Sequence, residues 1–375
     1  MGAAAAWAGL SGGLVGVSFS FWFGCLPGVG SGRQRSGFDP EIGSYGYFEQ
    51  VKLHFKGIGV VISEAQRLMM LAPKPGRLRV VLDSDTYNEI DDQFALVQVL
   101  LSPDRLNLEA IYATPFHNAR SEGPGHGMEL SYAEILRVLS RLGVSERGLV
   151  YRGVTQFVGF SKKAQAAEAV TDLIARARLG GLTDPLYVLA IGALSNVASA
   201  ILQAPDIVER ITIVWMGGNG PDWPRHFDQR GEFNLKQDIG AAQIVFNSGV
   251  PLVLVAAMPV ASHLRCSVPE IERHVEPHGA IGAFLAKRFK DYSSNHYGWT
   301  KPIWDMAPVG WLLNADWAPS SLIPTPIMSD EMQWNIDTDR HLMRYVGYVD
   351  RDLILRDFFT KLAAGYSKYL PKAIV

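Results

Sequence analysis

Short apolar runs alternate with longer amphipathic segments along most of the chain after residue 76. The runs have the length and content of buried strands, and the segments between them have the spacing of helices. We expect strands at 78–83, 108–114, 149–151, 187–191, 211–216 and 252–256, and helices at 91–101, 130–142, 163–179, 195–202 and 239–247. This alternation predicts an α/β fold with an open, mainly parallel sheet covered by helices on both faces, as in a Rossmann-like core.

The pattern becomes more helical after Pro269 and ends with two further strands. We expect helices at 279–289, 304–313 and 355–369, strands at 322–328 and 342–349, and a long loop at 217–236. The longest predicted loops follow strands, so they lie at one edge of the sheet. In open α/β sheets that edge is where ligands bind.

The first 37 residues differ from the rest of the chain. Residues 1–30 are apolar, rich in Gly and Ala and free of charged side chains, and the first positive residues, Arg33 and Arg35, follow them. A secretory signal carries its positive charge before the apolar core. Two interpretations therefore stay open for residues 1–37: an unusual anchor or export signal, or a start codon set too early.

We expect three parts in the chain. They are the extension 1–37, a lead-in 38–76 with helices near 48–55 and 63–71, and a main domain 77–375.

The composition is globular and carries no charge bias. Of 375 residues, 48% are hydrophobic and 19% charged, and Lys+Arg 35 against Asp+Glu 37 leaves a net charge of −2. The chain has no excess of basic residues, so its charge does not indicate a nucleic-acid partner. Two distant cysteines, Cys25 and Cys266, exclude a disulfide framework and a Cys-rich zinc site. We expect a cytoplasmic protein, attached to a membrane only if residues 1–30 are a real anchor.

Four carboxylates follow the first predicted strand. Asp83 and Asp85 end it and point the same way, because strand side chains alternate, and Asp91 and Asp92 open the next helix. Their repulsion is costly unless a cation lies among them, and Ca²⁺ tolerates such irregular oxygen ligands best. This stretch therefore indicates a metal site. The alternative is a helix cap followed by a solvated acidic turn.

Other polar residues follow later strands. Each alone also fits a turn residue or a helix cap. The candidates are Asn118, Ser195, Asn196, Glu232, Asn234 and Asp305.

Together these pieces resemble the inosine–uridine-preferring nucleoside hydrolase family, from about residue 78 to residue 359. The acidic run resembles the family's D-x-D-P-G-x-D-D, and residues 192–198, GALSNVA, resemble its G-P-L-T-N-x-A. Residues 213–218, IVWMGG, resemble its I-x-x-M-G-G, and residues 232–234 match its E-F-N. Trp304 and Asp305 stand where the family has His-Asp.

The resemblance implies a Ca²⁺-dependent hydrolase that splits a ribonucleoside, or a related N-ribosyl compound, into ribose and free base. It implies that Asp85 activates a water on the Ca²⁺ and that Asp83 orients the first turn. The implied metal ligands are Asp85, Asp92, Asp305 and the backbone carbonyl of Ser195. The implied ribose ligands are Asp91, Asn118, Glu232 and Asn234. A homo-oligomer, dimer or tetramer, is also implied.

The base side departs from the family pattern. The turn at Asn88 and Glu89 is two residues longer, and Glu89 either adds a ligand or faces solvent. His226 stands where the family has an Asn that meets the sugar. Trp304 replaces a proton-donating His and can only stack on a base. His296 is either the missing acid or a surface histidine.

Two alternatives from other classes stay open. A haloacid-dehalogenase-like phosphatase also begins with a strand ending in D-x-D, but it gives no role to the second acidic pair or to residues 232–234. A nucleoside or ribose binder without catalysis would keep the metal ligands and lose the leaving-group acid.

Overall fold

A computed structural model describes residues 62–221 and 231–365. The extension 1–37, the helix expected near 48–55 and His226 lie outside the described residues. Within the described ranges, no helix combines the length and the apolar character needed to cross a membrane.

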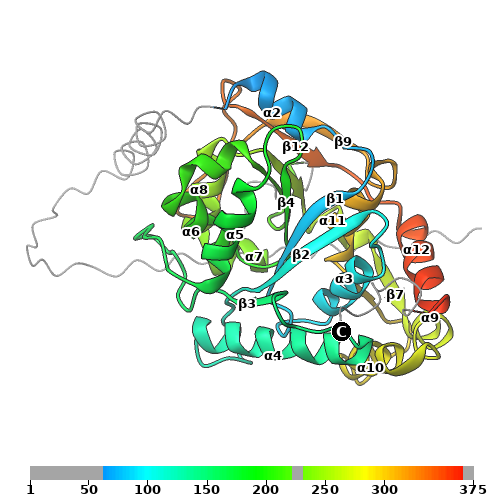
Figure 1. The fold of residues 1–375 in the computed structure, drawn as a ribbon. Coiled ribbons are helices and arrows are strands. Elements are labelled where there is room, and N and C mark those ends of the chain that lie inside the picture. Colours follow the sequence, from blue (N-terminus) through cyan, green and yellow to red (C-terminus); the bar gives the residue numbers. More distant parts are fainter. Residues whose placement is uncertain (1–61, 222–230, 366–375) are drawn as a thin grey trace, which may run out of the picture. The chain divides into compact units, whose positions relative to one another are not determined.

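An eight-stranded sheet forms the centre of the fold (Figure 1). Its order is β3-β2-β1-β4-β5-β6-β12-β9, and all neighbouring pairs are parallel except the antiparallel pair of β12 and β9 at one edge. The strands are β1 (Leu78–Ser84), β2 (Leu106–Ala113), β3 (Val150–Arg152), β4 (Leu186–Ala190), β5 (Ile211–Met216), β6 (Leu252–Val255), β9 (Ser320–Pro324) and β12 (Leu342–Val346). The predicted open, mainly parallel sheet is confirmed.

Helices cover both faces of this sheet. One group packs together through α5 (Glu168–Arg178), α6 (Ser195–Gln203) and α8 (Ile239–Ser248), and Figure 1 shows it on one side of β4. The other group contains α3 (Asp91–Leu100), α4 (Pro124–Leu142), α11 (Met306–Leu313) and α12 (Arg351–Ala363). The remaining helices are α2 (Glu64–Leu71), α7 (Phe233–Gln237), α9 (Val268–His274) and α10 (Gly279–Asp291).

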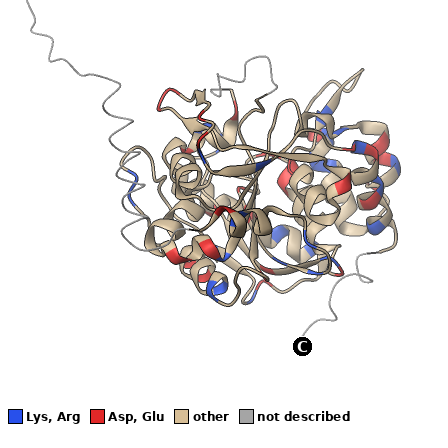
Figure 2. Cartoon of the chain, turned by 90° about the horizontal axis from the view of Figure 1, so that it is seen from above, with Lys and Arg blue, Asp and Glu red and all other residues tan. Residues whose placement is uncertain are grey.

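The central strands are apolar along their whole length because helices bury both of their faces. Every residue of β4, β5 and β6 is buried. In Figure 2 most Lys, Arg, Asp and Glu positions fall on the outer helices and loops. Charged residues that are buried inside this fold therefore need a specific explanation.

The direction of strand order reverses next to β1. From β1 the chain crosses to β2 on one side, and the later strand β4 pairs with β1 on its other side. The loops that leave β1 and β4 therefore diverge and open a crevice at the carboxyl ends of these strands.

Several predicted boundaries were wrong for identifiable reasons. The helix expected at 163–179 begins only at Glu168, because the backbone of Gln165 is bound by Ser199 Oγ at 3.1 Å and by Gln203 Nε2 at 2.7 Å, both from α6. The final helix begins early, at Arg351, because Asp350 caps it through the Leu353 N–H.

The C-terminal half also contains short strands that the pattern did not predict. The strand expected at 322–328 is two strands, β9 and β10 (Ile327–Met328), because prolines interrupt it. Two short antiparallel pairs, β7 (Arg265–Ser267) with β8 (Thr300–Pro302) and β10 with β11 (Trp334–Asn335), lie outside the main sheet.

Candidate active site at the carboxyl ends of the central strands

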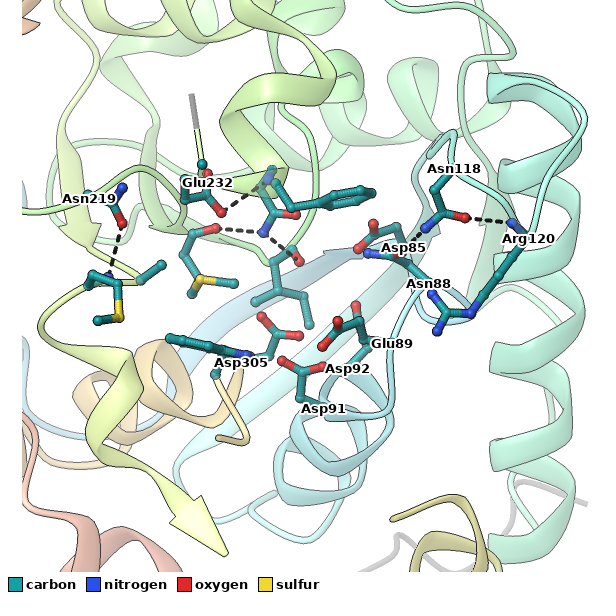
Figure 3. A pocket seen from close by; sticks show the side chains of 18 residues that line it. Asp85, Asn88, Glu89, Asp91, Asp92, Asn118, Arg120, Asn219, Glu232 and Asp305 are labelled. Atoms are coloured by element: carbon teal, nitrogen blue, oxygen red, sulfur yellow. Dashed lines mark hydrogen bonds between the residues drawn. The ribbon is translucent and has the colours of Figure 1, made fainter. Parts of the chain in front are cut away.

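A cavity of about 300 Å³ lies at the carboxyl ends of β1 and β5 (Figure 3). This volume is at the small end of the range for ligand sites. Most of the candidate residues line it: Asp85, Asp91, Asp92, Asn118, Glu232, Asn234, Trp304 and Asp305.

Buried carboxylates converge in this cavity. Oxygens of Asp91, Asp92 and Asp305 all lie within 4.8 Å of one another, and Asp85 lies beside them in Figure 3. We call these four residues the acid floor. The group of three contains Asp91, which the resemblance assigned to ribose, and not Asp85, which the resemblance made a ligand.

None of the acid floor serves as a helix cap. Asp305 occupies the cap position of α11 without capping it, and Ile90 is the cap residue of α3. One oxygen of Asp92 accepts a hydrogen bond from the Ser84 hydroxyl at 2.7 Å. The alternative of ordinary helix capping therefore does not explain these carboxylates.

Burial and mutual repulsion oppose ionisation of the acid floor. Burial, followed by the charge of Asp91, raises the pKa of Asp92 to about 8. Burial also raises the pKa of Asp91 to about 6, although the nearby Lys301 opposes this shift. Burial and neighbouring carboxylates raise the pKa values of Asp85 and Asp305 well above the ordinary range. A cation among these groups would remove the cost of ionising them.

The acid floor fits a hard cation such as Ca²⁺. Three of its oxygens, Asp85 Oδ2, Asp91 Oδ1 and Asp305 Oδ1, are buried without a hydrogen-bond partner. Buried carboxylate oxygens are normally bonded, so an unbonded group of them indicates a missing positive partner. All are oxygen donors, the type that Ca²⁺ and Mg²⁺ prefer.

Gly192 allows the chain after β4 to pass close to Asp85. A Cβ at this position would lie 3.0 Å from Asp85 Oδ1 and 2.5 Å from Thr114 Cγ2. Gly192, the first residue of the GALSNVA run, thus lets the backbone pack closely beside the acid floor.

Asp83 lies outside the cavity and joins β1 to α6. Its Oδ1 accepts a hydrogen bond from Asn196 Nδ2 at 2.7 Å, and Asn196 Oδ1 accepts the Val154 N–H at 2.8 Å. Burial raises the pKa of Asp83 to about 7, while the hydrogen bond from Asn196 opposes the shift. This contact is consistent with the expected orienting role of Asp83.

Glu232 and Asn234 are anchored to the backbone on the other side of the cavity. Glu232 caps α7 and accepts the N–H groups of Gly218 and Leu235, both at 2.7 Å. Asn234 Nδ2 donates to the carbonyls of Met216 at 2.9 Å and Ile191 at 3.3 Å. These contacts fix both side chains before any substrate enters.

Ser195 is not among the residues that line the cavity, although the resemblance gave its carbonyl to the metal. Its hydroxyl donates to Asp238 Oδ2 at 2.7 Å. Ile191 lines the cavity instead, directly after β4. The Ile191 carbonyl accepts a hydrogen bond from Asn234 Nδ2 at 3.3 Å, and Ser195 begins α6.

The longer turn after β1 contributes two residues that sequence reasoning left open. Asn88 Oδ1 accepts a hydrogen bond from Asn118 Nδ2 at 2.7 Å. Glu89 lines the cavity, forms an ion pair of 2.6 Å with the buried Lys301, and accepts a 2.9 Å hydrogen bond from the Tyr292 hydroxyl. Lys301 was missed because no local pattern marks its partner, which is far away in the sequence.

The candidates for the base side are separated in the structure. Trp304 lines the cavity and is half-buried. His296 is exposed, does not line the cavity, and places its Nε2 3.0 Å from the Lys290 carbonyl. His226 lies outside the described residues. Of the three, Trp304 is the one that the structure places at the site.

The fold and this cavity agree with a family match. The model of the inosine-uridine preferring nucleoside hydrolase family matches residues 80–353. The chain belongs to this family, and the haloacid-dehalogenase alternative is set aside.

Individual relatives share part of the sequence. A pyrimidine-specific ribonucleoside hydrolase, RihB, from Escherichia coli is 30% identical over 165 residues, which cover 43% of this chain and 51% of the relative. The match thus spans about half the length of that relative.

Solved structures share the fold. The chain is 21% identical to a purine-preferring ribonucleoside hydrolase from Gardnerella vaginalis, with a TM-score of 0.59, covering 76% of this chain and 98% of that one. It is 17% identical to a plant nucleoside hydrolase, the PpNRh1 enzyme, with a TM-score of 0.60, covering 78% and 100%.

Proposed function

We propose that the protein hydrolyses the N-glycosidic bond of a ribonucleoside or a related N-ribosyl compound, releasing ribose and a free base. The observation that carries this proposal is the acid floor: buried carboxylates with unbonded oxygens, in the cavity of a nucleoside hydrolase family member. The relatives are named as ribonucleoside hydrolases, which supports cleavage of the same bond, but one is named pyrimidine-specific and another purine-preferring.

We infer that the acid floor holds one Ca²⁺. Asp85, Asp92, Asp305 and the carbonyl of Ser195 are its proposed ligands, and Asp91 lies close to Asp92 and Asp305. Ile191, which lines the cavity where Ser195 does not, is the alternative source of a backbone ligand. Ca²⁺ bound here supplies positive charge that offsets the carboxylates and makes a nearby water more acidic.

Asp85 is the proposed general base. Asp85 lines the cavity, and its carboxylate takes a proton from a water held there as the water oxygen bonds to C1′. The C1′–N bond breaks in the same reaction, and its electron pair leaves with the base, which then acquires a proton.

Side chains around the acid floor are proposed to bind the ribose hydroxyls. All four line the cavity, and Figure 3 shows Asp91 beside Asp92 and Asp305, Asn118 beside Asn88, and Glu232 apart from both groups. Because hydrogen bonds hold Asn118, Glu232 and Asn234 in place, these side chains bind the flattened, cation-like ribose without reorganising.

Ribose release from a panel of purine and pyrimidine ribonucleosides tests this function. The full chain is assayed with Ca²⁺, with chelator, and as Asp85→Ala, with Asp104→Ala, an exposed position before β2, as the control. We expect the wild type to hydrolyse a nucleoside with Ca²⁺. Chelation and Asp85→Ala should abolish this turnover, and Asp104→Ala should preserve it. Activity that survives Asp85→Ala would overturn the mechanism, and nucleoside binding without turnover would indicate a non-catalytic binder.

The assembly and compartment are part of the same proposal. The family resemblance supports a dimer or tetramer, and the two distant cysteines are compatible with the cytoplasm. Light scattering of the purified chain tests the oligomer: a monomer at micromolar concentration contradicts it.

A further inference from the structure

Arg120 brings a positive charge to an otherwise acidic cavity. Among the described residues that line it, Arg120 alone is basic, against six acidic ones: Asp85, Glu89, Asp91, Asp92, Glu232 and Asp305. Arg120 is exposed and belongs to the loop after β2. In Figure 3 its side chain extends from beside Asn118 toward Asn88.

No described residue binds the guanidinium of Arg120. Its backbone N–H donates to Asn118 Oδ1 at 2.9 Å, which fixes the loop, but its side chain has no hydrogen bond or ion pair with any other residue in the described ranges. The nearby carboxylate of Glu89 is already paired with Lys301 at 2.6 Å. With respect to the described residues, the positive charge is therefore available to a ligand.

A second arginine adds to the positive charge beyond this side of the cavity. Arg288 lies over the Tyr87 ring at 5.7 Å, and its pKa is lowered by burial and, to a smaller extent, by the positive charge of Arg120. Arg288 is 3.9 Å from Glu134, a carboxylate that also pairs with Arg137. Two arginines, Arg137 and Arg288, thus share one carboxylate, and Arg120 adds a third positive charge that is not paired with it.

We propose that Arg120 selects an N-ribosyl substrate that carries an oxyanion, a carboxylate or a phosphate. This inference rests on the proposed function and narrows its substrate class. A guanidinium binds such groups through two parallel N–H donors, and an arginine without a protein partner can offer both. Two positions of the oxyanion fit this chemistry: on the departing base, or on the 5′ carbon of the ribose.

A matched set of probes distinguishes the two positions. The probes are uridine, 6-carboxyuridine and uridine 5′-phosphate, with inosine and inosine 5′-phosphate as a purine pair. Dissociation constants and kcat/KM are measured with Ca²⁺ for the wild type, Arg120→Gln, Arg120→Lys and Arg147→Gln. Arg147 is an exposed control in the loop before β3.

We expect the wild type to prefer one anionic probe over its neutral parent by about 10- to 100-fold, the size of a hydrogen-bonded charge pair. Arg120→Gln should remove this ratio, Arg120→Lys should keep part of it, and Arg147→Gln should keep all of it. The preferred probe then shows which position carries the oxyanion.

The failures can be told apart. If neutral nucleosides are hydrolysed and no anionic probe is preferred, or if Arg120→Gln leaves the ratio unchanged, the inference is wrong and the proposed function stands. If no probe is hydrolysed but an anionic one binds more tightly through Arg120, the hydrolytic function fails and the selectivity stands. If no probe is hydrolysed or bound, both are wrong.

Discussion

The acid floor and the opposite rim of the cavity, formed by Asn88, Asn118 and Arg120, are built in different ways. The floor consists of buried carboxylates at the ends of regular elements, supported by contacts such as the one between Ser84 and Asp92. The rim consists of loop residues that mainly hold one another. In the proposed function, the residues of the reaction thus lie on the rigid scaffold, whereas the proposed selectivity lies on a loop that can change without disturbing the sheet.

The largest effect is expected from Asp305→Ala, which removes one side of the acid floor. We expect kcat/KM to fall about 100- to 1000-fold, as when one preorganised electrostatic group is lost from a site. Ca²⁺ affinity, measured by calorimetry, should fall as well. Without metal, the Asp305→Ala variant should be no less stable than the wild type, because the substitution removes a carboxylate that repels its neighbours. Loss of activity through unfolding would contradict this explanation.

The second prediction concerns the pH dependence of the metal-free protein. Burial raises the pKa of Asp91 to about 6 and that of Asp92 to about 8, above the value of about 4 expected in the unfolded chain. Between pH 4 and 8 the folded form therefore binds more protons, and the free energy of unfolding falls as the pH rises.

Thermal unfolding in chelator from pH 5 to pH 8 measures this effect. Added Ca²⁺ should stabilise the protein more at pH 8 than at pH 5, because at low pH it must displace protons. A free energy of unfolding that is constant or rises across this range would contradict the proposed electrostatics.

A smaller effect is expected from Lys301→Met, next to the floor. Lys301 is 4% exposed and its ammonium pairs with Glu89, so the substitution leaves a partly buried carboxylate without its partner. We expect a loss of about 1–3 kcal/mol in urea denaturation with Ca²⁺ present.

The matched control is Lys287→Met. Lys287 forms an exposed pair with Asp291 at 2.5 Å, and exposed pairs contribute about 0–1 kcal/mol. Equal losses from the two variants would show that the pair beside the floor has no special role.

The smallest effect is expected on the base side. Trp304→Ala should lower kcat/KM about 2- to 10-fold through lost ring contacts, and Trp304→Phe should restore much of it. His296→Ala should change kcat/KM less than about twofold, because His296 does not line the cavity. A larger loss from His296→Ala than from Trp304→Ala would reverse these assignments and make His296 the candidate acid.

The sequence could predict the sheet and most of the floor because their signals are local. A strand followed by Asp83, Asp85, Asp91 and Asp92 carries its chemistry within one βα unit. The ion pair between Glu89 and Lys301 depends on packing between distant segments of the chain, and no sequence periodicity indicates it. That Ile191 lines the cavity and Ser195 does not depends on where β4 ends and α6 begins, which a motif does not specify.

The free guanidinium of Arg120 could not be predicted at all. An exposed arginine in a polar loop looks like any solvated charge, and only the position of the loop against the cavity distinguishes it. The same holds for Asn88, whose contact with Asn118 joins two separate loops.

The packing of α3 against α11 has a consequence for local motion. The two helices pack against each other and are mostly buried, yet Asp91 and Asp92 at the start of one lie close to Asp305 before the other. Without a cation this repulsion acts on the first turns alone. Their backbone amides should exchange hydrogen with solvent quickly in chelator and slowly with Ca²⁺, while those of β4 and β5 exchange slowly in both. Ion binding would then tighten one corner of the molecule and leave the rest of the fold as it was.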